Sequence, residues 1–171
     1  MKQRILVVCY PGNQQIRIVA EAIAQRCNAD LEWIKDRDNR LGLAGQLRSV
    51  IQALLRSTPW IQPVRCPPAA YSLVIIGTPV WAWSMASPVR SYLERYGSRC
   101  RRVAFFCTHN GSGADRVLAA LQGLCDKRPV AALALPQQNP TANEIDAAID
   151  HFVRRFNGHR GDTVFDARLA A

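Results

Sequence analysis

Long apolar runs, clustered metal ligands and paired cysteine motifs are absent from this chain. No apolar run approaches the ~20 residues of a membrane-spanning helix, and the stretch from Ile5 to Cys9 is shorter than the core of a signal peptide. The six cysteines form no C-x-x-C pair, and no Cys/His cluster has zinc spacing. We therefore expect no membrane contact, no metal site and six reduced thiols in a cytoplasmic protein.

Lysine and acidic side chains are also scarce. Only three of the 22 basic residues are lysines, and 13 acidic residues leave a formal net charge of +9. The arginines are scattered, and their one dense cluster, Arg99 to Arg102, lies in a turn before a predicted strand. Without a recognition helix or an RNA-binding signature, this pattern predicts no nucleic-acid partner. A basic surface instead suits an acidic partner protein, and the oligomeric state stays open.

What the chain does contain is a regular alternation of short apolar runs and amphipathic segments. Five predicted strands are the runs 5–9, 31–34, 73–76, 103–107 and 130–135. Five predicted helices are the segments 15–26, 43–56, 85–96, 114–124 and 141–156. The last helix should open with a Thr141-x-x-Glu144 capping box, and Ser87-Pro88 should cap the third. The stretch from Thr58 to Pro68 holds four prolines and should be irregular.

This alternation predicts a three-layer α/β fold. Right-handed crossovers give a doubly wound sandwich with a five-stranded parallel sheet in the order 2-1-3-4-5. With 171 residues and no repeat, we expect one domain over residues 1–157. Residues 158–171 lack periodicity and should form a C-terminal tail.

The most informative stretch runs from Tyr71 to Trp83 and reads YSLVIIGTPVWAW. Its apolar run suits a strand buried on both faces and should end at the turn residues Gly77-Thr78-Pro79. Trp81 and Trp83 then fall in a loop at the carboxyl end of the strand. Ligands bind at this edge of an open α/β sheet, so the two indoles can stack on a planar ligand or anchor a protein partner.

The loops after the first, third and fourth strands should converge on that edge. They are predicted at residues 10–15, 78–84 and 108–113. GTPVWAWSMASPVRSYL from Gly77 and CTHNGSGADRVLAAL from Cys107 resemble the second and third flavin loops of the flavodoxin-like FMN proteins, with the helices that follow. ILVVCY and VAEAIAQ resemble the first strand and first helix of that family, so the resemblance covers roughly residues 3–157.

The resemblance implies a role for several loop residues. Thr78, Pro79, Val80 and Trp81 match the second loop, which in the family lies against the isoalloxazine and ribityl, and Trp81 is the candidate for ring stacking. The residues that match the third loop, whose glycines let backbone N–H groups approach the ring, are Thr108, Gly111 and Gly113. Next to them, His109 either contacts a ring carbonyl or is an exposed loop histidine.

The first loop departs from the family pattern S-x-T-G-x-T, whose hydroxyl and N–H groups hold the phosphate. An ungapped comparison puts Pro11, Asn13, Gln14 and Ile16 at the four specified positions, which removes every hydroxyl and the glycine. A shift of two residues would bring Gly12 and Asn13 to the glycine region. At ~0.5–1.5 kcal/mol for each lost hydrogen bond, FMN binding should be weakened or absent.

Two hypotheses of function follow. In the first, the chain binds FMN and transfers electrons, or reduces quinone-like acceptors with NAD(P)H; the flavin supplies the chemistry and no catalytic side chain is assigned. In the second, the chain keeps the fold, has lost FMN and acts as a binding or regulatory module. The altered first loop favours the second hypothesis, and the second and third loops favour the first.

Overall fold

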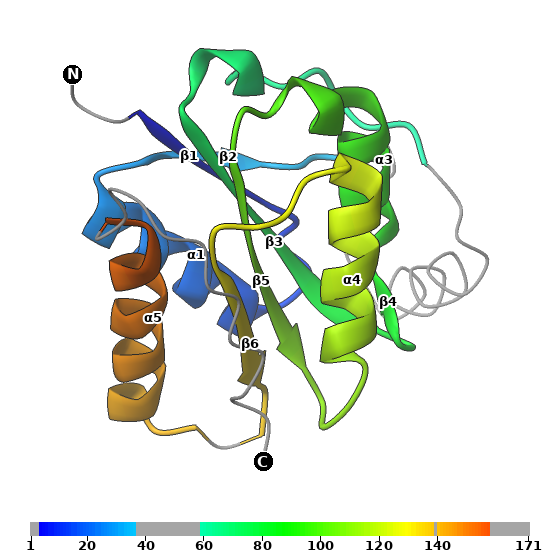
Figure 1. Cartoon of the computed structure of the whole chain (residues 1–171). Helices are drawn as coiled ribbons and strands as arrows, with labels where there is room; N and C mark the ends of the chain where they lie inside the picture. The colour runs from blue at the N-terminus through cyan, green and yellow to red at the C-terminus, as the bar shows by residue number, and fades with distance from the viewer. Residues whose placement is uncertain (1–3, 37–58, 139, 158–171) are drawn as a thin grey trace.

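A computed structural model describes residues 4–36, 59–138 and 140–157, in which strands and helices alternate along the chain (Figure 1). The strands are β1 (Ile5–Cys9), β2 (Asp30–Trp33), β3 (Leu73–Trp81), β4 (Ser84–Met85), β5 (Val103–His109) and β6 (Ala132–Pro136). The α-helices are α1 (Gln14–Cys27), α3 (Ser87–Tyr96), α4 (Ala114–Cys125) and α5 (Ala142–Asn157). Two short 3₁₀ helices, η1 (Pro68–Ala70) and η2 (Gly97–Arg99), precede β3 and β5.

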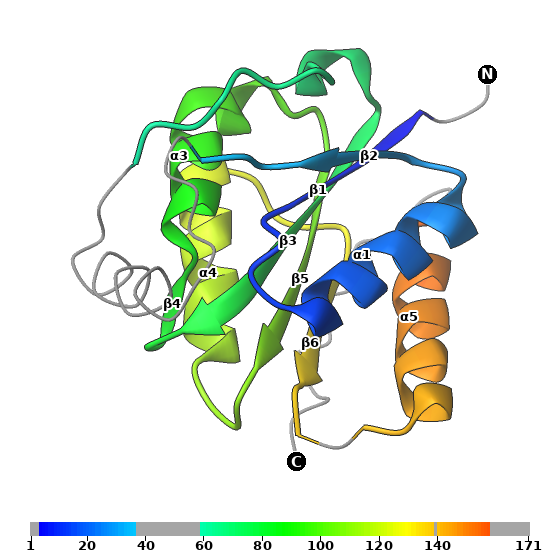
Figure 2. The same ribbon diagram turned by 180° about the vertical axis from the view of Figure 1, so that it is seen from behind.

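Five of the strands form a parallel sheet in the order β2-β1-β3-β5-β6. Counted along the chain without β4, this is the predicted order 2-1-3-4-5, so the predicted fold is confirmed. Helices α1 and α5 cover one face of the sheet, and α3 and α4 cover the other (Figures 1 and 2). The strand order reverses between β1 and β3, and ligands bind beside such a reversal in doubly wound sheets.

The central strands are buried on both faces, as expected of a parallel sheet with two helical layers. Side chains alternate along each strand, so Phe105 of β5 packs in the α3/α4 layer and Phe106 in the α1/α5 layer. Tyr92 is the largest fully buried side chain in the first layer, and Phe106 and Phe152 are the largest in the second. Burial of large apolar side chains, at ~1.5–3 kcal/mol each, holds the three layers together.

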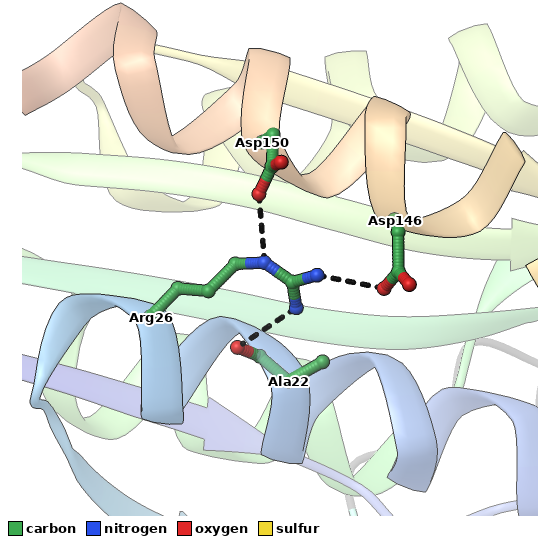
Figure 3. A network of polar contacts seen from close by, with 4 residues as sticks. All are labelled: Ala22, Arg26, Asp146 and Asp150. Atoms are coloured by element: carbon green, nitrogen blue, oxygen red, sulfur yellow. Dashed lines mark hydrogen bonds and ion pairs between the residues drawn. The ribbon is translucent and has the colours of Figure 1, made fainter. Parts of the chain in front are cut away.

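Helices α1 and α5 are also joined by an ion-pair network on the surface (Figure 3). The Arg26 guanidinium donates to Asp146 Oδ1 through Nη2 at 2.6 Å and to Asp150 Oδ1 through Nε at 2.7 Å. Its Nη1 also donates to the Ala22 carbonyl of its own helix. Because exposed ion pairs contribute only ~0.2–1 kcal/mol each, this network fixes the helix pairing more than it stabilises the fold.

Strand β3 is longer than predicted, and the prediction of a turn at Gly77-Thr78-Pro79 is wrong. A Cβ atom at Gly77 would overlap the Phe106 ring, so this glycine makes room for an aromatic side chain instead of bending the chain. Pro79 is tolerated because of its register. The odd-numbered residues of β3 direct their backbone N–H and C=O groups toward β1. Because β1 ends opposite Gly77, it has no residue opposite Pro79, and the missing N–H of Pro79 removes no hydrogen bond between the two strands.

The predicted loop after β3 is a β-hairpin. Trp81 pairs with Ser84, and the two residues between them, Ala82 and Trp83, have φ values of 45° and 56°. Positive φ at both central residues defines a type I′ turn, which usually contains Asn or Gly. The predicted cap of the next helix also differs, because Ala86 is the N-cap residue of α3 and Ser87 lies inside the helix.

The other predicted helix and strand bounds within the described residues agree with the structure to within two residues. Thr108 and His109 end β5 instead of starting a loop. The capping box of α5 is confirmed, because the Thr141 N–H donates to Glu144 Oε2 and the Glu144 N–H donates to Thr141 Oγ1. The predicted helix at 43–56 and the predicted tail at 158–171 lie outside the described residues. Within the described ranges, no helix has the length and apolarity of a membrane span.

Candidate functional site

The carboxyl ends of β1, β3 and β5 lie at one edge of the sheet and carry three short connections. The first loop is Tyr10 to Asn13, between β1 and α1; the β3–β4 hairpin replaces the predicted second loop; and the third loop is Asn110 to Gly113, between β5 and α4. All three lie toward the lower end of the sheet in Figures 1 and 2. The predicted convergence of the three segments is therefore present.

Trp81 connects the hairpin to the first loop. Its half-buried indole meets the Tyr10 ring edge-on, with ring centroids 5.9 Å apart. A Cβ atom built on Gly12 would lie 2.6 Å from Trp81 Cζ2 and 2.9 Å from Pro79 Cγ. The indole and the proline ring therefore lie directly against the backbone at Gly12, and three of the predicted site residues meet here.

Trp83 connects the hairpin to the third loop. The indole N–H of Trp83 donates to Ser112 Oγ at 3.1 Å. A Cβ atom on Gly113 would lie 3.0 Å from Trp83 Cα and Cδ1 and 3.2 Å from Val80 Cγ1. Gly113 has a φ of 89°, which disfavours any residue with a Cβ atom, so both space and backbone geometry require glycine here. At 58% exposed, Trp83 still presents much of its surface to solvent.

Thr78 and Thr108, the two threonines of the predicted site, are buried and bonded within the protein. Thr78 Oγ1 accepts the Ala86 N–H and donates to the Pro79 carbonyl, so it ties the end of β3 to the start of α3. Thr108 Oγ1 accepts from the side-chain amide of Gln137. Neither hydroxyl faces an open site, and both residues shape the edge of the sheet.

Gly111 differs from the other glycines of the site because its Cα faces open space. It is exposed, has a φ of 87°, and a Cβ atom there would meet no atom within 4 Å. Its backbone is therefore accessible to a ligand that lies against the third loop. Of the predicted third-loop residues, Gly111 faces outward, Gly113 packs under Trp83 and Thr108 points inward.

The first loop forms two hydrogen bonds within the protein and leaves donors free at the start of α1. Pro11 has no N–H, and the Gly12 N–H donates to the Tyr10 carbonyl at 2.8 Å in a three-residue turn. Asn13 caps α1, with its Oδ1 accepting the Ile16 N–H at 2.9 Å. In the described part of the chain, the backbone N–H groups of residues 13–15 donate to no other group.

The nearest arginine is directed elsewhere. The Arg17 guanidinium lies 5.5 Å from the centroid of the Trp33 ring, in a cation–π contact on the surface. An open depression of about 420 Å³ lies along the start of α1, and its lining residues are Pro11, Asn13, Gln14, Arg17, Ile18 and Glu21. This depression lies beside the first loop and not between the hairpin and the third loop.

The two cysteines near the site are unreactive. Burial raises the pKa of the Cys9 thiol far above its ordinary value, against a small opposite effect of Arg17. Burial, with a further contribution from Asp115, raises the pKa of Cys107 to about 12. Both thiols are buried and stay protonated at neutral pH, so neither is an activated nucleophile there. The described residues also hold no cluster of metal-ligating side chains.

Several residues of the site were missed by the sequence analysis. Tyr10 contacts Trp81, Ser112 binds Trp83, and Gln137 follows β6 and reaches Thr108. Gln15 also reaches the end of β6, because its side-chain amide donates to the Pro136 carbonyl. The available signal was topological: all parallel strands end at the same edge, so the loop after the last strand belongs to the site region.

The fit of FMN to these residues differs between its two ends. The accessible backbone at Gly111 and the exposed indole of Trp83 suit a planar ring. The first loop does not fit a phosphate in the family manner, because it has no serine or threonine hydroxyl and its cap oxygen already accepts the Ile16 N–H. Trp83 also spans the space between the hairpin and the third loop, so a ring must stack on this indole or displace it.

Solved structures with the same fold include a flavoprotein, a flavodoxin and a quinone oxidoreductase. A flavoprotein from Lactobacillus acidophilus NCFM in complex with FMN is 19% identical, with a TM-score of 0.68 over 88% of this chain and 98% of that one. Oxidised flavodoxin 1 from Bacillus cereus is 12% identical, with a TM-score of 0.58 over 92% and 99%. An NAD(P)H:quinone oxidoreductase from Methanothermobacter marburgensis is 12% identical, with a TM-score of 0.55 over 95% and 100%.

Sequence comparison identifies the family. At such low identities the structural likeness shows the fold alone, and no protein of curated function matches the sequence. The pattern of the flavodoxin family, however, matches residues 4–151, which include the first loop, the hairpin and the third loop. The chain therefore belongs to the flavodoxin family.

Proposed function

We propose that this protein binds a flavin at the carboxyl edge of its sheet and transfers electrons through it, either to a partner protein or from NAD(P)H to quinone-like acceptors. The observation that carries the proposal is the contact between the hairpin and the third loop, in which Trp83 donates to Ser112 and packs on Gly113. This contact lies beside the β1/β3 reversal, where doubly wound sheets bind their ligands.

The residues at this edge would bind and orient the flavin and take no chemical step themselves. The bound ring would supply the redox chemistry. An indole face gives a large apolar contact, and the accessible backbone of Gly111 can approach the polar edge of a ring. The fold likeness to a quinone oxidoreductase is compatible with reduction of quinones and does not assign it.

Flavin titration followed by reduction tests the proposal. Purified protein should quench the fluorescence of added FMN saturably and shift its visible spectrum. Under anaerobic conditions, bleaching of the bound flavin by NAD(P)H and its recovery with a quinone would indicate a reductase. Bleaching by dithionite alone would indicate an electron carrier. Neither quenching nor a spectral shift would contradict flavin binding at this site.

A second candidate function is supported by the first loop. It lacks the serine and threonine hydroxyls of the family pattern, and its Gly12 N–H is bonded within the protein, as expected if the fold had lost its cofactor and served as a binding or regulatory module. A colourless protein that leaves FMN fluorescence unchanged would favour this function. The six cysteines are all free thiols, which supports our proposal of a reducing, cytoplasmic environment for either function.

We also propose an acidic protein partner, which would bind at the opposite end of the sheet. Five cations lie in the two turns that precede β5 and β6, and none is in an ion pair with a carboxylate of the described residues: Arg99, Arg101, Arg102, Lys127 and Arg128. The Lys127 ammonium donates to the Ser98 carbonyl, which joins the two turns. Strand β5 separates this basic surface from the flavin edge by roughly 20 Å, so a docked partner would leave that edge open.

Charge reversal at matched sites tests the basic surface. Changing Arg99, Arg101 and Arg128 to Glu should weaken binding of an oligoglutamate peptide at least about tenfold. The control changes Arg17, Arg116 and Arg154 to Glu, which alters the net charge equally but elsewhere. Equal losses in both proteins would show that binding follows net charge alone and would contradict a defined docking surface.

A further inference from the structure

We infer that Asn110 and Gly111 form a self-modifying site in the third loop, at which the asparagine loses its side-chain nitrogen as ammonia and becomes aspartate or isoaspartate. The modified loop carries a new carboxylate at the edge of the candidate site. The modification follows from the loop itself, and only its effect on a flavin rests on the proposed function.

The first observation is the order of the two residues. The sequence places glycine after asparagine twice, at Asn110–Gly111 and at Asn157–Gly158. In such a pair the backbone nitrogen of the second residue can reach the side-chain carbonyl carbon of the first and close a five-membered ring. A Cβ atom on the second residue hinders this approach, whereas glycine has none and adopts a wide range of backbone angles. Both pairs therefore have the composition that favours ring closure.

The second observation is the open conformation of the third loop. Asn110, Gly111 and Ser112 are all exposed, and no backbone hydrogen bond closes a turn across them. Among the described residues, the Gly111 N–H has no acceptor and the Asn110 carboxamide has no partner. Gly111 has a φ of 87°, and a Cβ atom there would meet no atom within 4 Å. The nitrogen can therefore turn toward the carboxamide without breaking a hydrogen bond.

The third observation is that other asparagines are restrained. Three of them are followed by a described residue, and each is fixed by a hydrogen bond: Asn13, Asn28 and Asn143. In the first, the carboxamide oxygen accepts an N–H. In the other two, the nitrogen that follows the asparagine is itself a donor. Of the asparagines whose next residue is described, Asn110 alone combines a following glycine with an unbonded nitrogen.

The reaction consumes water and needs no other reactant. The Gly111 nitrogen loses its proton to solvent and attacks Asn110 Cγ, so that a C–N bond forms, the Cγ–Nδ2 bond breaks and ammonia leaves. Water then opens the cyclic imide at one of its two carbonyl carbons. Opening at Cγ gives aspartate, and opening at the backbone carbonyl carbon gives isoaspartate, in which the main chain runs through the former side chain. No electrons are transferred, and the net change replaces an amide by a carboxylate.

Either product alters the edge that the proposed function assigns to a flavin. Both place a negative charge beside the accessible backbone of Gly111, which can approach the polar edge of a ring. Isoaspartate also adds a main-chain carbon ahead of Ser112, whose hydroxyl accepts the Trp83 indole N–H. We therefore expect the modified loop to bind a flavin several-fold more weakly, and a bound flavin to slow the modification by covering the loop.

Ageing of the purified protein tests the inference. After incubation in mildly alkaline buffer, mass spectrometry of proteolytic peptides should show an amide replaced by a carboxylate at Asn110. An isoaspartate-specific methyltransferase should label the same peptide. A synthetic peptide with the sequence of residues 107–115 serves as the positive control. Modification of the peptide but not of Asn110 in the folded protein would overturn the inference.

Substitutions in the two Asn–Gly pairs test the assigned cause. Gly111→Ala keeps the asparagine and adds a Cβ atom in open space, and it should slow the modification at least about tenfold. Asn157→Ala removes the other pair and should leave the rate at Asn110 unchanged. Circular dichroism checks that both variants are folded. Equal rates in Gly111→Ala and the unmodified protein would contradict the role of the glycine.

Flavin titration separates this inference from the proposed function. Asn110→Asp supplies the aspartate product directly and should bind FMN several-fold more weakly than Asn110→Gln, which keeps a neutral amide. Equal affinities of the two variants would contradict the effect of the new charge on the flavin. Failure of the unmodified protein to bind FMN would overturn the proposed function, whereas the mass change at Asn110 would still establish the modification site.

Discussion

The two sides of the candidate site are built differently, although both are held by a tryptophan of the same hairpin. On one side Trp81 covers the first loop, in which the Gly12 N–H is bonded within the protein and Asn13 caps α1. On the other side Trp83 is exposed, and the third loop keeps an uncovered backbone at Gly111. A loop that is covered by an indole supports the fold, and a loop that leaves its backbone accessible can still bind a ligand.

The largest expected difference separates the two glycines of the third loop. Gly113→Ala should lower the free energy of unfolding by about 3 kcal/mol, because it combines a positive φ with a crowded Cβ position. Gly111→Ala has nearly the same φ and open space around it, so it should cost only about 1 kcal/mol. Denaturant unfolding measures both. Equal losses would mean that Trp83 does not pack on the loop.

The two tryptophans should also differ. Trp81→Ala removes a half-buried indole that packs on Tyr10, Pro79 and Gly12, and should destabilise the protein by about 2 kcal/mol. Trp83→Ala removes a more exposed ring and one hydrogen bond, with an expected loss of about 1 kcal/mol. Flavin binding should show the reverse order. A larger effect of Trp81→Ala on riboflavin affinity would move the ring toward the first loop.

One substitution in the hairpin should stabilise the protein. Ala82 has a φ of 45°, in the left-handed region that disfavours a Cβ atom. Ala82→Gly removes this strain, and we expect a gain of about 0.5–1 kcal/mol after the greater chain entropy of glycine in the unfolded state is included. Thermal unfolding at matched concentration measures the gain. A loss of stability would show that the turn is not of type I′ in solution.

The smallest expected effect is the pH dependence of the N-terminal caps of α1 and α5. Hydrogen bonds from Thr141 lower the pKa of Glu144 below its ordinary value of 4.5. A carboxylate with a lowered folded pKa stabilises the protein above its unfolded pKa, and this contribution disappears as the pH falls through the folded pKa. The amide signal of Thr141 should therefore titrate below pH 4.5, whereas that of Ile16, capped by uncharged Asn13, should not. Parallel titration of both amides would contradict the comparison.

Much of the fold follows from local pattern. The apolar runs and amphipathic segments predicted the sheet order, and Thr141 and Glu144 marked the start of α5 correctly. The extension of β3 could not be predicted in this way, because Gly77 and Pro79 have the composition of a turn. They belong to a strand for tertiary reasons: the Phe106 ring needs the space at Gly77, and β1 ends before Pro79.

The candidate site was predictable in place but not in detail. Topology alone brought the three segments to one edge, and the missing hydroxyls of the first loop were visible in the sequence. The type I′ hairpin was hidden because Ala82 and Trp83 replace the usual Asn and Gly. The first loop is covered by Trp81, which lies some 70 residues away along the chain. The sequence of the loop alone therefore does not predict this contact.

The most direct test of the account is nuclear magnetic resonance of the ¹⁵N-labelled protein during addition of riboflavin, and then of FMN. We predict that both flavins shift the Trp83 indole N–H and the amides of Gly111 and Gly113. No shift at the hairpin and third loop with either flavin would contradict it.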